Sequence, residues 1–276
     1  MKNSLRARRA AALCAALALT ACEAFDYHPY CVDTGGKTRV NAANAARIEE
    51  ALAGRRAFRF AFVSDTQRWY DETADFVADV NRRADVDFVV HGGDFSDFGV
   101  NDEFLWQRDI LDGLGVPYVS VIGNHDCIGT GEQSYGRVFG DTNYAFTAAG
   151  VRFVLMNTNA LEFDYSDPVP DIDFLRRQIE GFPDACARSI VVAHCKPFDE
   201  QFNNNMAEYY HAYVRRLPGV MFHLSGHTHK TGAYRLFEGE PYRDDFTYYT
   251  TTCVEDREYM VFDISEEGYS YEVVRF

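Results

Sequence analysis

Short apolar runs alternate along the chain with amphipathic segments of helical period from residue 58 onward. Three apolar runs, at 58–63, 86–91 and 118–122, predict strands, because strands buried on both faces of a sheet are nearly continuously hydrophobic. Between them, the segments 72–83 and 101–114 repeat apolar residues every three or four positions and predict helices. Strands that alternate with helices in this way are typical of a parallel sheet with crossover connections.

The pattern changes after a glycine-rich stretch at 128–142, which we expect to be a loop. Two strand-like segments, 144–146 and 151–156, are joined at Ala149-Gly150 and predict a hairpin. Alternating helices and strands are then predicted at 172–180, 190–193, 204–217 and 220–224. Residues 232–276 contain short aromatic-rich runs without helical period, which suggests a second sheet of antiparallel type.

The first 21 residues have the character of a processing signal. Four basic residues precede an apolar core at 10–19, which is too short to span a bilayer as a helix. The core runs into Leu19-Thr20-Ala21-Cys22, which resembles the lipobox of bacterial lipoproteins. This resemblance implies cleavage before Cys22 and acylation of its sulfur, so that the protein is anchored to a membrane. The alternative is an ordinary secretory signal with a chance cysteine, and either interpretation places the mature protein outside the cytoplasm, on the periplasmic or cell-surface side.

Residues 22–56 are expected to form a tether followed by an N-terminal helix at about 42–53. Asn41 is the predicted cap of this helix, and Asn101 is the predicted cap of the helix at 101–114, because a short polar side chain can accept a hydrogen bond from the first turn. The mature length fits one sizeable domain, at residues 57–276, better than two.

Charge and cysteine content narrow the possible partners. Loss of the four basic leader residues changes the formal charge from −15 to −19. A chain this acidic, with no visible basic groove, is not expected to bind nucleic acid, and an anionic substrate would need positive charge supplied locally, for example by metal ions. Five cysteines follow Cys22 without a C-x-x-C pair, so one disulfide, involving Cys31 for example, stays open as a possibility.

Polar side chains gather directly after five of the predicted strands. Carboxylate, amide and imidazole groups are ligands for divalent ions such as Mn, Fe, Zn or Mg, and there are enough of them for two ions. No cysteine joins the cluster by spacing, which argues against a cysteine-rich structural zinc site. The residues at the strand ends are Asp65, Gln67, Asp94, Asn124, His125, His194, His227 and His229.

The order of these blocks resembles the calcineurin-like metallophosphoesterase superfamily. The blocks are Asp65-Thr66-Gln67, Gly92-Gly93-Asp94, Gly123-Asn124-His125-Asp126, the strand-final His194, and Gly226-His227-Thr228-His229. The resemblance implies an α/β fold, the four-layer α/β/β/α sandwich of the metallophosphoesterase type. It also implies two divalent metal ions, which hold a phosphate ester and activate a water for attack on phosphorus.

The resemblance assigns a role to each matching residue. Asp94 would bridge two ions, and His125 would be a non-ligand that protonates the leaving group. Asp65, Gln67 and His229 would complete one ion site, and Asn124, His194 and His227 the other.

Two neighbours of these blocks have alternative interpretations. Asp97 stands where some relatives place a carboxylate that orients the histidine corresponding to His125, although a turn or capping role is equally compatible with the sequence. Asp126 is expected to support the loop rather than bind metal.

One block departs from the common Asp-x-His pattern, because Gln67 stands at the histidine position. Glutamine is neutral and a weaker donor than imidazole. The first ion would therefore be held more loosely, or it would be Mn or Mg rather than Zn. Alternatively, Gln67 is not a ligand and a water molecule takes its place. Arg68 and Trp69 follow directly and are the candidates for substrate contact.

The histidines outside the blocks receive structural interpretations. His91 and His223 lie inside apolar strands and are expected to be hydrogen-bonded in the core, whereas His28 and His211 are expected to be solvated.

The expected function is hydrolysis of a small phosphorylated molecule, preferably a phosphomonoester, by an exported and lipid-anchored protein. A phosphodiesterase of the same superfamily uses the same ligands and is the nearest alternative. A degenerate, non-catalytic binding protein is the alternative from another class, and it would be supported by the missing histidine at Gln67.

Overall fold

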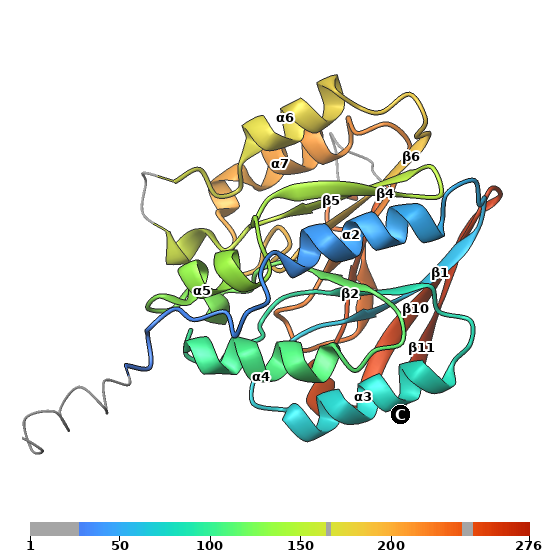
Figure 1. Ribbon diagram of the computed structural model, residues 1–276. Helices are drawn as coiled ribbons and strands as arrows, with labels where there is room; N and C mark the ends of the chain where they lie inside the picture. Colours follow the sequence, from blue (N-terminus) through green and yellow to red (C-terminus); the bar gives the residue numbers. More distant parts are fainter. Residues whose placement is uncertain (1–27, 164–166, 239–244) are drawn as a thin grey trace, which may run out of the picture.

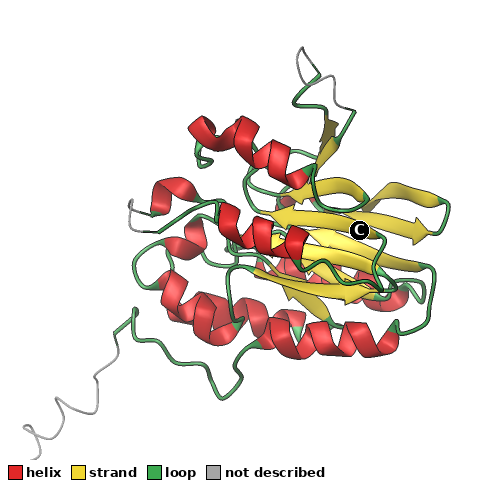
Figure 2. Cartoon of the chain, turned by 90° about the horizontal axis from the view of Figure 1, so that it is seen from above, coloured by secondary structure: helices red, strands yellow, loops and turns green. Residues whose placement is uncertain are grey.

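Two β-sheets lie face to face at the centre of the structure, with helices on both outer faces (Figure 1). The structure is a computed structural model and describes residues 28–163, 167–238 and 245–276. The expected leader and Cys22 lie outside the described residues. The two sheets and their helical layers confirm the four-layer α/β/β/α architecture, and Figure 2 shows the strands grouped together with helices around them.

The first sheet has the strand order β11-β10-β1-β2-β3. Its parallel part confirms the three predicted strands, as β1 (Phe58–Val63), β2 (Phe88–His91) and β3 (Tyr118–Ser120). The last two strands of the chain, β10 (Glu258–Ser265) and β11 (Gly268–Arg275), extend the sheet in antiparallel fashion beyond β1.

The second sheet has the order β4-β5-β6-β7-β9-β8 and contains the predicted hairpin. Strands β5, β6, β7 and β9 run parallel to one another, while β4 and β8 close the two edges in antiparallel fashion. The strands are β4 (Tyr144–Ala148), β5 (Val151–Met156), β6 (Arg188–Ala193), β7 (Val220–Ser225), β8 (Gly232–Tyr234) and β9 (Thr247–Thr250).

The expectation that residues 232–276 form a sheet of their own is wrong. Strands β8 and β9 join the second sheet beside β7, and β10 and β11 join the first sheet beside β1. The physical reason is that each parallel sheet would otherwise end on an edge strand with unpaired backbone groups. The last four strands of the chain therefore extend both sheets: β9 pairs with β7, and β10 pairs with β1.

The helices form the outer layers. Helices α3 (Tyr70–Arg82) and α4 (Asn101–Leu111) lie on one side of the two sheets, and α6 (Ile172–Glu180) and α7 (Ala207–Val214) lie on the other (Figure 1). Helix α2 (Val40–Ala51) contacts β3 and β4, and its Ala45 and Ile48 enter the core between the sheets. Within the described ranges, none of the helices is both long and apolar enough to cross a membrane.

Helix α5 (Gly131–Val138) occupies part of the stretch that the sequence predicts to be a loop. Its two glycines, Gly131 and Gly136, lower the intrinsic helix propensity. Tyr135 and Val138 are nevertheless fully buried in the apolar layer beneath α3 and α4. Tertiary packing of this face therefore stabilises a helix that local propensity does not favour.

The core between the sheets is rich in phenylalanine. The ring of Phe60 stacks on Phe88 and Phe262, with ring centroids 5.4 Å and 5.2 Å apart. It meets Phe153 of the opposite sheet edge-on, with ring centroids 5.5 Å apart. These side chains come from alternate positions of their strands, which all point to one face of a sheet. The packing fixes the two sheets relative to each other and thereby fixes the ends of their strands.

Neither of the two predicted asparagine caps is a cap. Asn41 lies inside α2 and is buried, where its amide accepts a hydrogen bond from the Ser120 backbone nitrogen at 2.9 Å and donates to the Ser120 carbonyl at 3.2 Å. Asn101 is the first residue of α4 and accepts a hydrogen bond from the Asp33 nitrogen at 3.1 Å. Both side chains satisfy distant backbone groups, which local sequence cannot reveal.

Candidate metal centre

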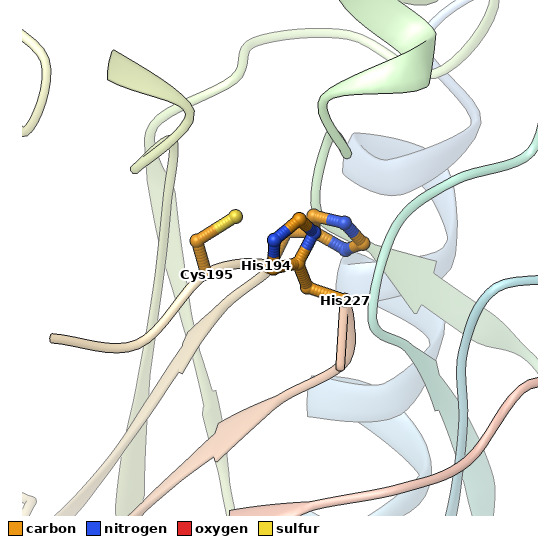
Figure 3. A group of neighbouring side chains, drawn as sticks. All are labelled: His194, Cys195 and His227. Carbon is orange, nitrogen blue, oxygen red and sulfur yellow. The ribbon is translucent and has the colours of Figure 1, made fainter. Parts of the chain in front are cut away.

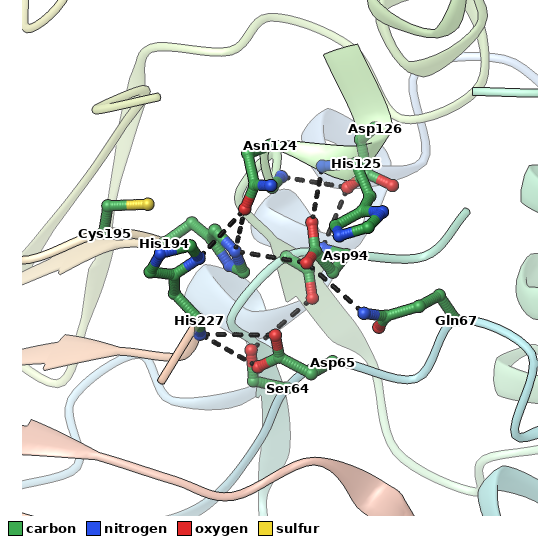
Figure 4. Close-up of polar contacts among 12 residues, drawn as sticks. Ser64, Asp65, Gln67, Asp94, Asn124, His125, Asp126, His194, Cys195 and His227 are labelled. Atoms are coloured by element: carbon green, nitrogen blue, oxygen red, sulfur yellow. Dashed lines mark hydrogen bonds and ion pairs between the residues drawn. The ribbon is translucent and has the colours of Figure 1, made fainter. Parts of the chain in front are cut away.

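The carboxyl ends of five parallel strands meet at one end of the sandwich (Figure 4). In the first sheet, β1, β2 and β3 lead directly into the blocks that hold Asp65, Asp94 and Asn124. In the second sheet, β6 leads into His194 and β7 into the block that holds His227 and His229. The structure therefore brings all the predicted ligand positions to one place, with contributions from both sheets.

The backbone is strained where these side chains emerge. Asp65, Asp94, His227 and His229 have positive φ angles of 56°, 62°, 67° and 49°. Residues other than glycine rarely adopt this conformation, and such residues concentrate at functional sites. Gly123 lies so close to Asp94 that a Cβ atom at this position would stand 2.0 Å from the Asp94 carboxylate, so only glycine allows the two loops to approach.

One group of donor atoms is centred on Asn124. The Asn124 Oδ1 atom lies 3.1 Å from His194 Nε2 and 3.0 Å from His227 Nδ1, and Asp94 Oδ2 lies 3.3 Å from His194 Nε2. His194 Nδ1 stands 2.7 Å from the Gly92 carbonyl, which can only accept, so Nδ1 carries a proton and Nε2 is the atom directed into the group. We call Asp94, Asn124, His194 and His227 the buried cluster.

Charge within the buried cluster is set by burial and by the carboxylates. Burial opposes the charged form of His194, but Asp94 and Asp65 outweigh it and raise the pKa of His194 to about 10. Burial lowers the pKa of His227 below its ordinary value. Without a cation, the negative charge of Asp94 is thus balanced by a proton on His194, which a metal ion would displace.

A second group of donor atoms lies on the other side of Asp94, and we call it the open cluster. Asp65 Oδ1 lies 3.2 Å from His229 Nε2, and this contact raises the pKa of His229. Gln67 Nε2 stands 3.4 Å from Asp94 Oδ2, and Gln67 Oε1 is buried without a hydrogen-bond partner in the described part of the chain. The side chain of His229 is 49% exposed, whereas that of His194 is fully buried.

The donor spacing fits divalent metal ions. Ligand atoms that share one ion at about 2.1 Å stand roughly 3.0–3.4 Å apart. The contacts of the buried cluster span 3.0 to 3.3 Å, and Asp65 and His229 are 3.2 Å apart. The buried and unpartnered Gln67 Oε1 atom is a further oxygen available to an ion, since buried polar atoms ordinarily have a partner.

His125 lies beside the clusters, and its ring Nδ1 is directed toward Asp97. Its backbone nitrogen donates to Asp94 Oδ1 at 3.0 Å. Its ring Nδ1 lies 3.0 Å from the backbone carbonyl of Asp97, which can only accept the proton, and 3.9 Å from the Asp97 carboxylate. The Asp97 carboxylate itself pairs with Arg68. Asp97 therefore contacts the histidine mainly through its main chain.

Asp126 supports the loops, as expected. Its buried carboxylate accepts hydrogen bonds of 2.8 to 2.9 Å from four backbone nitrogens, which belong to Asp94, Phe95, Ser96 and Gly123. It ties the loop after β2 to the loop after β3. Both loops carry proposed ligands, so Asp126 orients the site without being part of it.

Cys195 lies within reach of the buried cluster, contrary to the expectation that no cysteine joins the site (Figure 3). Its sulfur and one nitrogen each of His194 and His227 lie within 4.8 Å of one another. The thiol donates to Asn159 Oδ1 at 3.2 Å, and all five cysteines of the described residues are free. Cys195 has no partner cysteine at a metal-binding spacing, so a search for C-x-x-C pairs does not find it. The sequence signal for its place near the site is that it directly follows the strand-final His194.

The remaining histidines are structural. Burial lowers the pKa values of His91 and His223 to about 3, and their Nε2 atoms pair with Thr66 and Tyr210 as expected for core residues. The expectation that His211 is solvated is wrong. Its ring is buried, stacks on Phe237 at 3.9 Å and pairs with the Tyr248 hydroxyl at 2.8 Å, because α7 turns this face toward the sheet.

The two candidates for substrate contact differ in position. Arg68 has a φ of 61° and a half-exposed side chain that pairs with Asp97 beside His125. Trp69 instead packs against the apolar layer under α3 and α4. Arg68 is thus placed at the edge of the site, and Trp69 turns away from it.

Comparison with known proteins agrees with this geometry. A family model described as calcineurin-like phosphoesterase matches residues 58–231, more than half of the chain. An uncharacterised protein from Bacillus subtilis strain 168, YvnB, is 23% identical over 225 residues, which cover 69% of this chain but only 17% of YvnB.

Two solved structures share the fold at low sequence identity. GAP50, described as the anchor in the inner membrane complex of Plasmodium, has a TM-score of 0.62 at 15% identity, covering 80% of this chain and 85% of GAP50. The purple acid phosphatase PPD1 from yellow lupin has a TM-score of 0.58 at 13% identity, covering 79% of this chain and 51% of PPD1.

Proposed function

The chain belongs to the calcineurin-like phosphoesterase family of metal-dependent hydrolases, and from that premise we propose that it hydrolyses phosphate esters with two divalent ions. The observation that carries the proposal is the position of Asp94. Its Oδ2 atom lies 3.3 Å from His194 of the buried cluster and 3.4 Å from Gln67 of the open cluster. This position between the two clusters supports a role for one carboxylate in holding both ions.

The two clusters define which residues would hold each ion. His194, His227 and Asn124 would hold one with Asp94, and Asp65, His229 and Gln67 would hold the other with Asp94. Bound there, divalent cations supply positive charge for an anionic phosphate and lower the pKa of a water. The bound cations would thus supply the positive charge that this acidic chain lacks.

His125 is proposed to protonate the leaving oxygen. Its Nδ1 proton is held by the Asp97 carbonyl, which leaves Nε2 as the atom that transfers a proton. The Asp97 carboxylate lies 3.9 Å from the ring nitrogen Nδ1. Asp97 is a positioning residue in this scheme, and Arg68 neutralises Asp97 while lying at the edge where a phosphate oxygen would bind.

We prefer a phosphomonoester as the substrate, and a phosphodiester is the alternative, because both reactions use the same ligands. The test is the hydrolysis of p-nitrophenyl phosphate and bis-p-nitrophenyl phosphate by the same preparation with added Mn²⁺. A faster rate on the monoester supports the proposal. A faster rate on the diester favours the alternative, and no hydrolysis with Mn²⁺, Fe²⁺ or Zn²⁺ would indicate a non-catalytic binding protein.

We further propose that the protein is exported and acylated at Cys22, on the basis of the lipobox-like sequence. The test is labelling with an alkyne-bearing fatty acid in a bacterial host, followed by fractionation. Label in the membrane fraction is expected for the natural chain and should be absent from the Cys22→Ser variant. Equal labelling of both chains would contradict acylation at this residue.

A further inference from the structure

Exposed apolar side chains surround the end of the sandwich that carries the proposed metal centre. Phe98, Ile128, Leu161 and Phe198 are 59%, 37%, 67% and 56% exposed. Each lies in a loop that follows a different strand, namely β2, β3, β5 and β6. We call these four residues the apolar rim.

The rim adjoins the proposed catalytic residues along the chain. Phe98 follows Asp97, whose carbonyl holds His125, and Ile128 follows the short helix of residues 125–127. Phe198 comes four residues after His194. Single exposed apolar residues are ordinary on protein surfaces, but a set gathered around one site from separate loops is typical of an interaction surface.

Two rim residues are held outward by specific backbone contacts. The Phe98 nitrogen donates to Glu103 Oε2 at 3.1 Å. The Phe198 nitrogen donates to Asn204 Oδ1 at 2.8 Å, and Phe198 has a φ of 72°, which is unfavourable for a bulky residue. The loops thus keep a strained backbone at a position where the ring is mostly exposed.

A groove of mixed polar and apolar lining adjoins the rim. Its volume is about 850 Å³, which is in the range of ligand-binding pockets. The rim residue Leu161 lines the groove, and Asn159, two residues earlier, donates to the Ile122 carbonyl at 3.0 Å and accepts from Cys195 at 3.2 Å. The groove therefore begins next to the loops that carry Asn124 and His194. Apolar residues such as Leu161, Phe163 and Met206 share its lining with the carboxylates of Asp167, Asp171 and Asp173.

The start of the described chain lies at this same end of the molecule (Figure 1). The Tyr30 carbonyl accepts a hydrogen bond from Thr130 Oγ1 at 3.0 Å, and the Tyr30 ring lies against Gly129, next to Ile128. His28 follows Cys22 by six positions in the sequence, which corresponds to at most about 20 Å of extended chain. A lipid on Cys22 would therefore hold the apolar rim close to the membrane surface.

We infer that the apolar rim rests on the lipid surface and that the substrate is a lipid phosphoester, whose phosphate reaches the metal centre from that surface. This inference rests on the proposed phosphoesterase activity and on acylation of Cys22. The attraction is apolar, because the acylated chain, with a formal charge of −19 after loss of the leader, is repelled by anionic membranes. Neutral, zwitterionic bilayers are thus the surface that fits.

The contact with lipid is tested without reference to catalysis. The full chain with the substitution Phe198→Trp is purified from its membrane fraction and reconstituted in phosphatidylcholine vesicles, with brominated phosphatidylcholine as the quencher. The indole fluorescence that this substitution adds should be quenched. The fluorescence of the natural chain, to which Trp106 contributes from a position 53% exposed on α4, should be quenched less. If the fluorescence of the variant and of the natural chain is quenched equally, or not at all, the inference is wrong. It is also wrong if the protein forms a dimer that buries position 198.

Substrate class is tested by the ratio of two rates, for phosphatidic acid in phosphatidylcholine vesicles and for p-nitrophenyl phosphate. The Leu161→Ser/Phe198→Ser variant should lower the ratio of the lipid rate to the p-nitrophenyl phosphate rate about tenfold, through lost apolar burial. The Trp106→Ser control should leave the ratio unchanged. If the ratio is unchanged in the rim variant and p-nitrophenyl phosphate is still hydrolysed, the inference of a lipid substrate is wrong but the proposed function stands. If the natural chain hydrolyses neither substrate, the proposed function itself is wrong.

Discussion

The two donor clusters on either side of Asp94 are built differently. In the buried cluster, His194 is fully buried and its ring is fixed by the Gly92 carbonyl at 2.7 Å. In the open cluster, His229 is half-exposed and Gln67 supplies a neutral side chain whose oxygen is unpartnered in the described structure. A preorganised cluster with two imidazoles, one of them fully buried, binds metal tightly, whereas a cluster with one half-exposed imidazole binds it loosely. The difference predicts one tightly held ion and one exchangeable ion.

The most damaging change should be Asp94→Asn, because it alone affects both clusters. The amide keeps one oxygen but loses the negative charge, so we expect activity at background and strongly reduced metal content. Metal analysis beside p-nitrophenyl phosphate hydrolysis provides the measurement. Asp75→Asn, on the exposed surface of α3, is the matched control. A normal metal content in Asp94→Asn would refute the shared position of this carboxylate.

A matched pair of histidine variants tests the comparison itself. His194→Ala should remove the tightly held ion, and His229→Ala should weaken the exchangeable ion by roughly 10- to 100-fold in affinity. The measurement is the metal retained after dialysis, with far-UV circular dichroism to verify folding. His227→Ala repeats the test of the buried cluster if His194→Ala fails to fold. Equal metal loss from both clusters would abolish the distinction between them.

His125→Ala should separate catalysis from metal binding. Because the ring Nδ1 of His125 is held by the Asp97 carbonyl, the variant should keep its metal and lose roughly 10²- to 10⁴-fold in rate, the usual size of general acid effects. A substrate with a better leaving group should recover part of the rate. Loss of metal together with rate would make His125 a ligand instead.

Gln67→His should have the smallest effect and should act on the open cluster only. Imidazole is a stronger donor than an amide for ions such as Zn²⁺, so the exchangeable site should bind Zn²⁺ more tightly relative to Mn²⁺. Competition binding of the two ions to natural and variant chains measures this shift. An unchanged preference would indicate that Gln67 does not coordinate.

The sequence predicts the strands and the site together, for one physical reason. The apolar runs that bury β1, β2, β3, β6 and β7 are short and continuous, and each is followed within a few residues by its polar block. Parallel strands place such blocks at one edge of a sheet. Asp65, Asp94, Asn124, His194 and His227 therefore converge without any knowledge of the helices.

The misses have a common cause, which is packing between residues far apart in the chain. Helix α5 contains two glycines and forms because Tyr135 and Val138 are buried in an apolar core, with α4 as a neighbour. Asn41 and His211 resemble surface residues locally, but they satisfy Ser120 and Tyr248, which lie on distant strands. Cys195 enters the site because β6 ends beside β7, a pairing that no spacing rule encodes.

The central claim is that one carboxylate joins two unequal ion sites, and metal stoichiometry tests it most directly. The protein is purified without chelators, saturated with Mn²⁺, and its bound metal is counted before and after dialysis. The account predicts two ions per chain on saturation and one after dialysis, with activity returning when the second is restored. A single ion per chain at full activity would contradict it.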